Sequence, residues 1–292
     1  MTRSIHLALA RLPTGLASYP RVLLNRRPAV EEVTDPPVVE AAVRNAPLDA
    51  RKVEAYAAIC GFGRGSAPPV TFPHVLAMPL HLRIFATEVF PLRPMGLIHL
   101  ENVIEVPGEL RPGMRFDISV SARNYRALDA GLAFDMATEI TSAGEPVWRE
   151  TCVFLSRWAE GSARPAGRPP RPPKAPRDAT VLGSQIEVSQ QTAWRYARVS
   201  RDFNPIHLND RAARYFGLRG AIMHGMWSLA RSLAEAPPPR AARIDTTFLT
   251  PVQLPARVVI KEWSENGQRR RALCDVRTGR VHMYAHWPES EG

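Results

Sequence analysis

The residue types best suited to chemistry gather in one short stretch, residues 200–207, which reads Ser-Arg-Asp-Phe-Asn-Pro-Ile-His. Asp202 and His207 flank Asn204-Pro205, a pair that favours a turn over a continuous helix. Such a turn can bring carboxylate and imidazole to one cavity, where they could hold a water, accept its proton and return a proton to a substrate. Asn204 would support that geometry. We therefore take this stretch as a candidate active-site loop.

Each of these residues also has a structural interpretation. Asp202 can cap a helix or turn, Asn204 can close a turn, and His207 can be a hydrogen-bonded histidine of the core. A second motif favours the functional interpretation, because Met-His-Gly-Met at residues 223–226 opens an apolar helical segment. The Gly225 N–H would then be an unpaired donor at a helix N-terminus, able to polarise a carbonyl.

Composition and charge narrow the classes of protein. The 292 residues are 45% hydrophobic, enough for a substantial core, and the net charge of +10 suggests an anionic partner. That partner could be a nucleic acid, an acidic carrier protein, a phosphorylated ligand or a membrane surface. The three cysteines are scattered without a CxxC pair, which indicates buried reduced thiols and no metal site. No apolar run is long enough to span a bilayer.

The hydrophobic pattern predicts the same order of elements twice. Each half has a capped helix, a loop, an apolar helix and four strand-like runs, an α+β pattern with an antiparallel sheet packed on a helix. The predicted helices are residues 50–59, 75–89, 190–199 and 224–236. The predicted strands are residues 97–106, 114–125, 132–141, 147–158, 244–250, 257–263, 269–276 and 281–287.

The two halves are joined by a basic, proline-rich linker. Ordered structure is expected to begin near Pro47, after a flexible or docked extension. An ungapped alignment of the two capped helices indicates an internal duplication in which only the second half has kept ionisable groups in its loop. The aligned pairs are Asp49 with Ser189, Tyr56 with Tyr196, Phe62 with Asp202 and Ala67 with His207. The expected parts are an extension (1–46), a first unit (47–159), a linker (160–178) and a second unit (179–292).

Residues 200–207, with Ala-Ile-Met-His-Gly-Met at 221–226, resemble the motif of the MaoC-like (R)-specific enoyl-thioester hydratases and 3-hydroxyacyl-thioester dehydratases. The resemblance covers most of the chain, including the basic linker and residues 248–255. It implies a double hot-dog fold, in which each of two units wraps an antiparallel sheet around a long helix. It also implies that the first unit binds the acyl chain.

The resemblance implies a reaction and a role for each site residue. Asp202 and His207 would hold the water, Asn204 would support them, and the Gly225 amide would bind the thioester oxygen. The reaction would be reversible hydration of trans-2-enoyl thioesters to (3R)-hydroxyacyl thioesters, without metal or redox cofactor. The family usually has glycine where this chain has Arg201. If that position takes a positive φ, arginine strains the loop.

Several residues near the loop are expected to contact the substrate or its carrier. Basic side chains there could pair with the phosphates of coenzyme A or of an acyl carrier protein's phosphopantetheine arm, and the alternative is ordinary solvated surface. The expected contacts are Ser200, Arg201, His224, Met226 and Arg219, with Arg198 and Arg214 at the mouth of the loop.

The sequence also predicts the setting of the protein. We expect a cytoplasmic protein, either monomeric, because a double unit mimics a dimer of single units, or homodimeric. A catalytically weak acyl-thioester-binding partner of the same fold is the main alternative, favoured by Arg201. A nucleic-acid-binding protein ranks lower and is not predicted, because no aromatic platform accompanies the basic linker.

Overall fold

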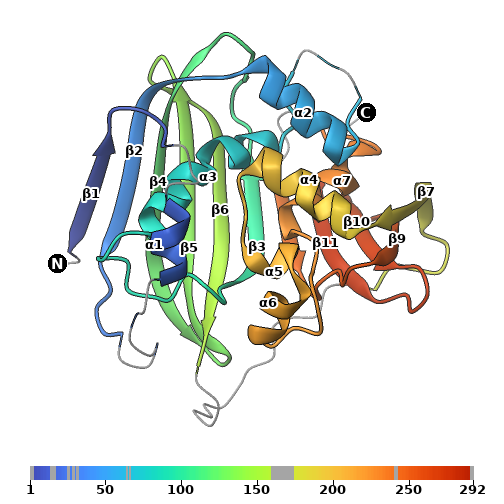
Figure 1. Ribbon diagram of the computed structural model, residues 1–292. Coiled ribbons are helices and arrows are strands. Elements are labelled where there is room, and N and C mark those ends of the chain that lie inside the picture. The colour runs from blue at the N-terminus through green and yellow to red at the C-terminus, as the bar shows by residue number, and fades with distance from the viewer. Residues whose placement is uncertain are drawn as a thin grey trace.

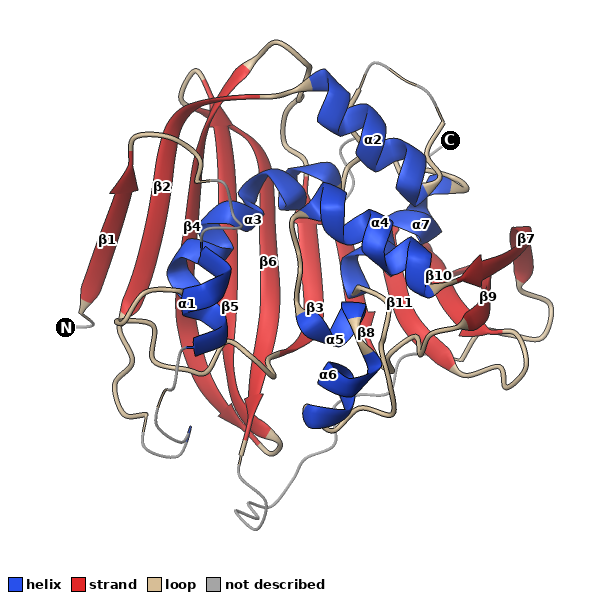
Figure 2. Cartoon of the chain, viewed as in Figure 1, coloured by secondary structure: helices blue, strands red, loops and turns tan. Residues whose placement is uncertain are grey.

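The computed structural model describes residues 3–13, 18–24, 27, 30, 33–63, 65, 67–158, 174–239 and 243–289. These residues form an 11-stranded sheet, with helices lying across one of its faces (Figures 1 and 2). The strands lie in the order β1-β2-β4-β5-β6-β3-β8-β11-β10-β9-β7. Neighbouring strands are antiparallel throughout, except for the parallel pair β1 and β2.

Each helix and strand predicted from the sequence is present, with bounds that differ by a few residues, and further elements join them before residue 48, at residues 180–188 and at residues 205–215. The strands are β1 (Ser4–Leu9), β2 (Val38–Pro47), β3 (Ile98–Glu105), β4 (Arg115–Leu128), β5 (Gly131–Ser142), β6 (Glu145–Arg157), β7 (Thr180–Val188), β8 (Ile244–Phe248), β9 (Ala256–Glu265), β10 (Gln268–Asp275) and β11 (Val281–Pro288). The helices are α1 (Tyr19–Leu24), α2 (Ala50–Cys60), α3 (Phe72–Phe85), α4 (Gln190–Ser200), α5 (Pro205–Leu208), α6 (Asp210–Tyr215) and α7 (Gly225–Ala234).

The two halves meet at the centre of the sheet, where β3 pairs with β8. Ile104 lies opposite Ile244, and Asn102 lies opposite Thr246. The helix α3 covers the first half and is buried on nearly all sides, as its run of apolar residues predicts. One core cluster extends through both halves, and the Trp227 indole N–H of α7 donates to the Ile59 carbonyl of α2 at 3.0 Å. The halves therefore share one sheet and one core.

The helices α2 and α4 confirm the predicted correspondence between the halves. Their N-caps are Asp49 and Ser189, the two positions aligned from the sequence. The rings of Tyr56 and Tyr196 face each other at 6.1 Å between centroids. Each helix ends in the left-handed region, at a residue with positive φ. The repeated sequence thus builds the same capped helix twice.

The expectation that ordered structure begins near Pro47 is wrong. The described residues before it include β1, α1 and β2, and β2 pairs with β4 through Val39 opposite Ala122 and Val43 opposite Ile118. The burial of β2 alternates along the strand, which is typical of a sheet strand. Its sequence follows prolines, however, and this pattern predicts an extension. The strand β7 was missed in the same way. Most of the linker predicted at residues 160–178 lies outside the described residues.

Two expectations from composition can be compared with the fold. Cys60, Cys152 and Cys274 are all buried free thiols, as predicted. Within the described ranges, no helix combines the length and apolar character needed to cross a membrane.

Candidate active site

Two local features shape the candidate loop, the backbone turn at Arg201 and the helix cap at Asn204. The helix α4 ends at Ser200, and Arg201 follows with a φ of 62° in the left-handed region. Arg201 therefore occupies the strained conformation that the usual glycine would adopt without cost. Next, Asn204 caps α5, its side-chain oxygen accepting from the Ile206 N–H at 3.3 Å. The Asn204 N–H donates to Oδ1 of Asp202 at 3.1 Å, so Asn204 helps to shape the loop.

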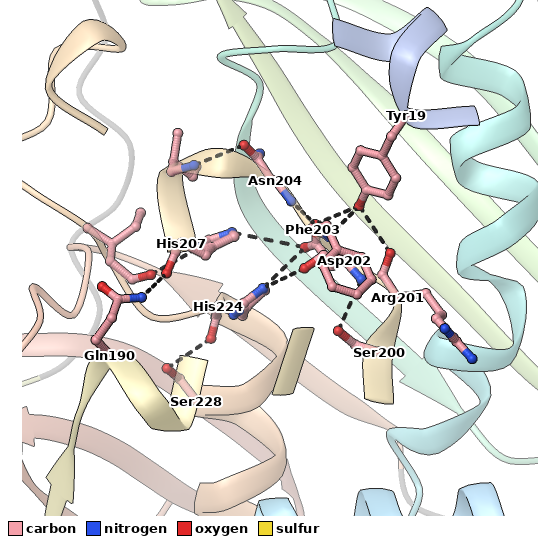
Figure 3. A network of polar contacts seen from close by, with 12 residues as sticks. Tyr19, Gln190, Ser200, Arg201, Asp202, Phe203, Asn204, His207, His224 and Ser228 are labelled. Carbon is pink, nitrogen blue, oxygen red and sulfur yellow. Dashed lines mark hydrogen bonds and ion pairs between the residues drawn. The ribbon is translucent and has the colours of Figure 1, made fainter. Parts of the chain in front are cut away.

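The loop brings Asp202 beside two histidines (Figure 3). Oδ2 of Asp202 lies 4.0 Å from Nε2 of His207 and 3.9 Å from Nε2 of His224. The His207 Nδ1–H donates to the Ile222 carbonyl at 2.9 Å, which leaves the Nε2 lone pair toward the carboxylate. The His224 Nε2–H donates to the Asp202 carbonyl at 3.0 Å, and the two imidazole rings stack with centroids 3.7 Å apart.

Burial and mutual contact set the protonation of this group. Burial lowers the pKa of His207 by more than the Asp202 carboxylate raises it. Burial, with His207 nearby, lowers the pKa of His224 to about 3. Burial raises the pKa of the Asp202 carboxyl, but His224, His207 and the Asn204 N–H outweigh it and hold that pKa below its usual range. At neutral pH the group is therefore a carboxylate beside two neutral imidazoles.

The spacing between Asp202 and His207 suits a water molecule. A separation of 4.0 Å is too long for a direct hydrogen bond but short enough for one water to bridge both groups. The carboxylate and the imidazole Nε2 are both acceptors here. A water that bridges them would therefore donate a hydrogen bond to each. Its oxygen lone pairs would then face outward. This arrangement prepares water as a nucleophile with a base already in contact.

The helix α7 begins directly beside the two histidines. Its N-cap is His224, whose side chain makes no capping hydrogen bond within the described structure. The first amides of α7, including that of Gly225, thus point from a helix N-terminus and can bind a developing oxyanion. A Cβ at Gly225 would come within 3.1 Å of a Phe248 ring carbon, so a larger residue would crowd this position.

The other predicted contact residues fall into two groups. Ser200 and Met226 are buried: Ser200 Oγ accepts from the Asp202 N–H at 3.2 Å, and Met226 belongs to the core cluster. Arg201 and Arg219 are exposed. The Arg219 carbonyl accepts from Arg214 Nε at 3.2 Å, which fixes backbone only and leaves the side chain's role as a carrier contact a prediction.

One residue of the site was missed by the sequence analysis. Tyr19, in α1, is buried, and its hydroxyl lies 3.0 Å from the Arg201 carbonyl and 3.3 Å from Oδ1 of Asp202 (Figure 3). The Phe203 N–H donates to the same hydroxyl at 2.5 Å. Tyr19 lies in the segment predicted to be an extension, 182 positions before Arg201. No local pattern of residues could therefore have linked the two.

Among the residues that the structure describes, two groups of side chains have the spacing of metal ligands. In Asp202, His207 and His224, and in His74, Glu150 and Cys152, the ligand atoms lie within 4.8 Å of one another. His224 turns an N–H, not a lone pair, toward Asp202, which makes it a poor ligand in this tautomer.

The second group is a buried ion pair that the sequence analysis did not anticipate. His74 Nδ1 lies 2.8 Å from Glu150 Oε2, and Asn102 donates to Oε1 at 2.7 Å. Burial raises the pKa of Glu150, but His74 and the hydrogen bonds outweigh it and hold that pKa at about 2. Burial lowers the pKa of His74, but the Glu150 charge outweighs it and raises that pKa above its ordinary value.

A cavity of about 1230 Å³ lies away from these groups, beside the loop that follows α2. Phe62 and Ala67, the sequence counterparts of Asp202 and His207, both line it, together with Trp148 and Pro237–Pro239. No residue of the stretch 200–207 is part of its lining. The candidate chemistry and this cavity thus belong to equivalent loops in different halves.

Comparisons with known proteins place this geometry in a family. A protein-family model described as "MaoC like domain" matches residues 167–285 of this chain. The 3-hydroxyacyl-thioester dehydratase X of Mycobacterium tuberculosis is 32% identical over 276 residues, which cover 94% of this chain and 97% of the relative. The chain belongs to the MaoC-like dehydratase family.

Solved structures agree with this MaoC-like assignment. The crystal structure of HtdX from Mycobacterium tuberculosis matches with a TM-score of 0.73 and 30% identity, over 85% of this chain and 98% of that one. Another Mycobacterium tuberculosis protein, described as having a double hot-dog fold, matches with a TM-score of 0.54 and 12% identity, over 89% of this chain and 97% of its own. The predicted α+β double hot-dog fold of this MaoC-like chain is confirmed.

Proposed function

We propose that this MaoC-like hydro-lyase interconverts trans-2-enoyl thioesters and (3R)-hydroxyacyl thioesters through Asp202 and His207. The observation that carries the proposal is the gap of 4.0 Å between a carboxylate and a neutral imidazole beside the N-terminus of α7. The name of the relative at 32% identity, 3-hydroxyacyl-thioester dehydratase X, supports the same substrate class.

In the hydration direction, the Gly225 N–H donates a hydrogen bond to the thioester carbonyl oxygen, which makes C3 of the enoyl group electrophilic. Water held by Asp202 and His207 attacks C3 and passes one proton to His207 Nε2. The enolate formed at the thioester then takes that proton from His207 at C2, so His207 returns to its neutral form and the elements of one water are added. Dehydration reverses these steps. A donor such as Gly225 typically contributes about a hundredfold or more in rate, and the acid/base pair a comparable factor.

The remaining parts of the proposal concern binding. The substrate's coenzyme A or phosphopantetheine arm is cargo, and the proposed chemistry uses protein groups and water without a redox cofactor. Exposed Arg201 and Arg219 are proposed to meet phosphates of that arm. The acyl chain is proposed to lie in the first half. The cytoplasm and a monomeric or homodimeric state remain the predicted setting.

The test is loss of the conjugated enoyl-thioester absorbance on addition of the purified protein. Short, medium and long trans-2-enoyl chains would each be offered on coenzyme A and on acyl carrier protein. The product is expected to resist a (3S)-specific hydroxyacyl dehydrogenase. Asp202→Ala and His207→Ala are expected to lose nearly all activity. Undiminished activity in both variants would overturn the site assignment.

A second function is favoured by one observation, the positive φ of Arg201. A strained loop costs stability unless it is held in place, and a partner protein that only binds acyl thioesters would tolerate a poorly placed Asp202. This reading predicts saturable binding of acyl thioesters without turnover at any chain length. Turnover by the wild-type protein would exclude it.

A further inference from the structure

Tyr19 reaches the candidate loop at its most strained point. Arg201 is a non-glycine residue in the left-handed region, a conformation that costs about 1–2 kcal/mol for L-residues. Such a conformation persists only where surrounding contacts hold it. The hydroxyl of Tyr19 contacts the carbonyl of Arg201 itself, at 3.0 Å.

The same hydroxyl also contacts the next peptide. The Arg201 carbonyl belongs to the peptide that precedes the Cα of Asp202, and the Phe203 N–H belongs to the peptide that follows it. Tyr19 accepts from that N–H at 2.5 Å while facing that carbonyl. One side chain thus brackets Asp202 on both sides and restrains the backbone from which its carboxylate projects.

The two oxygens of the Asp202 carboxylate face different groups. Oδ1 faces the loop, where it accepts from the Asn204 N–H at 3.1 Å and lies 3.3 Å from the Tyr19 hydroxyl. Oδ2 faces His207 and His224 at about 4 Å. Holding Oδ1 therefore aims Oδ2 at the place where the reacting water would sit.

The segment that carries Tyr19 is itself well anchored. Tyr19 and Val22 of α1 pack against Leu82 and Ala86 at the end of α3. The rings of Tyr19 and Phe203 meet edge to face, 6.1 Å apart. Farther along, Arg27 donates to the Thr87 carbonyl at 3.0 Å. Through these contacts, α1 connects the loop to the core around the end of α3.

We propose that Tyr19 is a positioning residue for Asp202, and that α1, through Tyr19, is a clamp without which the strained loop does not hold its reactive geometry. The clamp does not touch the reacting atoms. It acts by lowering the freedom of Asp202, and misplacement of a reacting group by about 1 Å can reduce rate about a hundredfold. This inference rests on the proposed function of Asp202.

Tyr19→Phe removes the hydroxyl and keeps the ring. We expect kcat to fall about tenfold or more while KM changes little, because binding groups are untouched. The matched control is Tyr125→Phe, since the Tyr125 hydroxyl is buried and finds no hydrogen-bond partner among the described residues. That control is expected to keep wild-type kcat. Equal kcat in Tyr19→Phe and the wild type would overturn the proposal.

Two further readouts separate positioning from simple loss of stability. Hydrogen exchange at residues 200–207 is expected to quicken in Tyr19→Phe and not in Tyr125→Phe, whether or not the protein turns over any thioester. The effect of Tyr19→Phe on kcat is also expected to shrink in an Arg201→Gly background, because glycine needs no restraint at that φ. Rapid exchange of the Phe203 amide in the wild type would contradict the clamp. Clamp behaviour in an inactive wild type would instead refute the proposed function.

Discussion

Two corresponding loops follow the helices α2 and α4, and they begin with the same turn but differ in what comes after it: the first leads to α3, whereas the second carries α5 and α6 before α7. Both helices have a side-chain N-cap and end in the left-handed region, at Gly61 with a φ of 83° and at Arg201 with a φ of 62°. After this shared turn, one loop carries Asp202 and the other Phe62. The scaffold therefore forms without the candidate catalytic groups, and those groups are an addition to it.

The surroundings of the two loops differ as well. The loop after α4 is packed against Tyr19, whose hydroxyl bonds its backbone. The loop after α2 instead borders the cavity of about 1230 Å³ through Phe62 and Ala67. One loop is thus hydrogen-bonded through its backbone around polar groups, while its counterpart leaves space lined partly by apolar groups. The loop that carries the candidate catalytic groups is therefore the one bonded by Tyr19, and the loop that lacks them is the one beside the cavity.

The largest expected effect comes from the groups present in only one loop. Asp202→Asn and His207→Gln should each lower kcat/KM about a hundredfold or more, because each removes one acceptor of the reacting water. Initial rates with an enoyl thioester measure this. Phe62→Ala in the counterpart loop is the matched control, with kcat expected to stay within about threefold of wild type. A comparable kcat loss in Phe62→Ala would show that the two loops are not functionally distinct.

A second prediction contrasts two carboxylates, Glu150 of the first half and Asp202 of the second. Glu150→Gln should lower the free energy of unfolding by about 3 kcal/mol, because it leaves the buried His74 without its counter-charge. Asp202→Asn should change it by about 1 kcal/mol or less, since that carboxylate is partly exposed and makes no direct ion pair. Urea unfolding of both variants checks the contrast. Similar losses would mean that Asp202 is structural too.

A third prediction concerns pH. The pKa of His207 and that of Asp202 both lie below their ordinary values, so the reactive form, neutral imidazole beside carboxylate, persists as pH falls. We expect kcat/KM to stay level through about pH 6.5, the ordinary histidine pKa, and to fall about tenfold per pH unit only below it, once His207 takes up a proton. A fall that begins above the ordinary histidine pKa would contradict the neutral His207.

A fourth prediction exchanges the two helix ends. Arg201→Gly should raise the free energy of unfolding by about 1 kcal/mol, because glycine adopts a positive φ without strain. Gly61→Ala should lower it by a similar amount, about 1 kcal/mol. A Cβ at Gly61 would meet the flexible end of Arg231 at 3.2 Å, so strain rather than collision dominates. Thermal unfolding should show opposite shifts of about 2–4 °C. Shifts of equal sign would show that the two helix ends are not equivalent.

The smallest expected effect is that of a chelator. Prolonged treatment with EDTA should leave kcat and the melting temperature unchanged, because the proposed water is held by Asp202 and His207 alone. A loss of activity restored by one divalent metal would instead identify Asp202, His207 and His224, or the His74 group, as ligands.

The sequence by itself determined the repeated elements and the family, and it singled out the loop residues whose side chains could do chemistry. Periodicity located both capped helices and α3, because these are local patterns of apolar and polar residues. It also found Asp202, His207 and Gly225, since a turn of a few residues joins the first two and a helix start marks the third. The double hot-dog expectation came from the same motif and is confirmed.

Only the tertiary structure decided what surrounds that loop. β2 and β7 looked like loop or linker because each needs a partner strand to become a strand at all. The bracket formed by Tyr19 and the buried pair of His74 with Glu150 both join residues far apart in the chain. Such contacts depend on which surfaces the folded core brings together, and no local pattern of residues encodes that pairing.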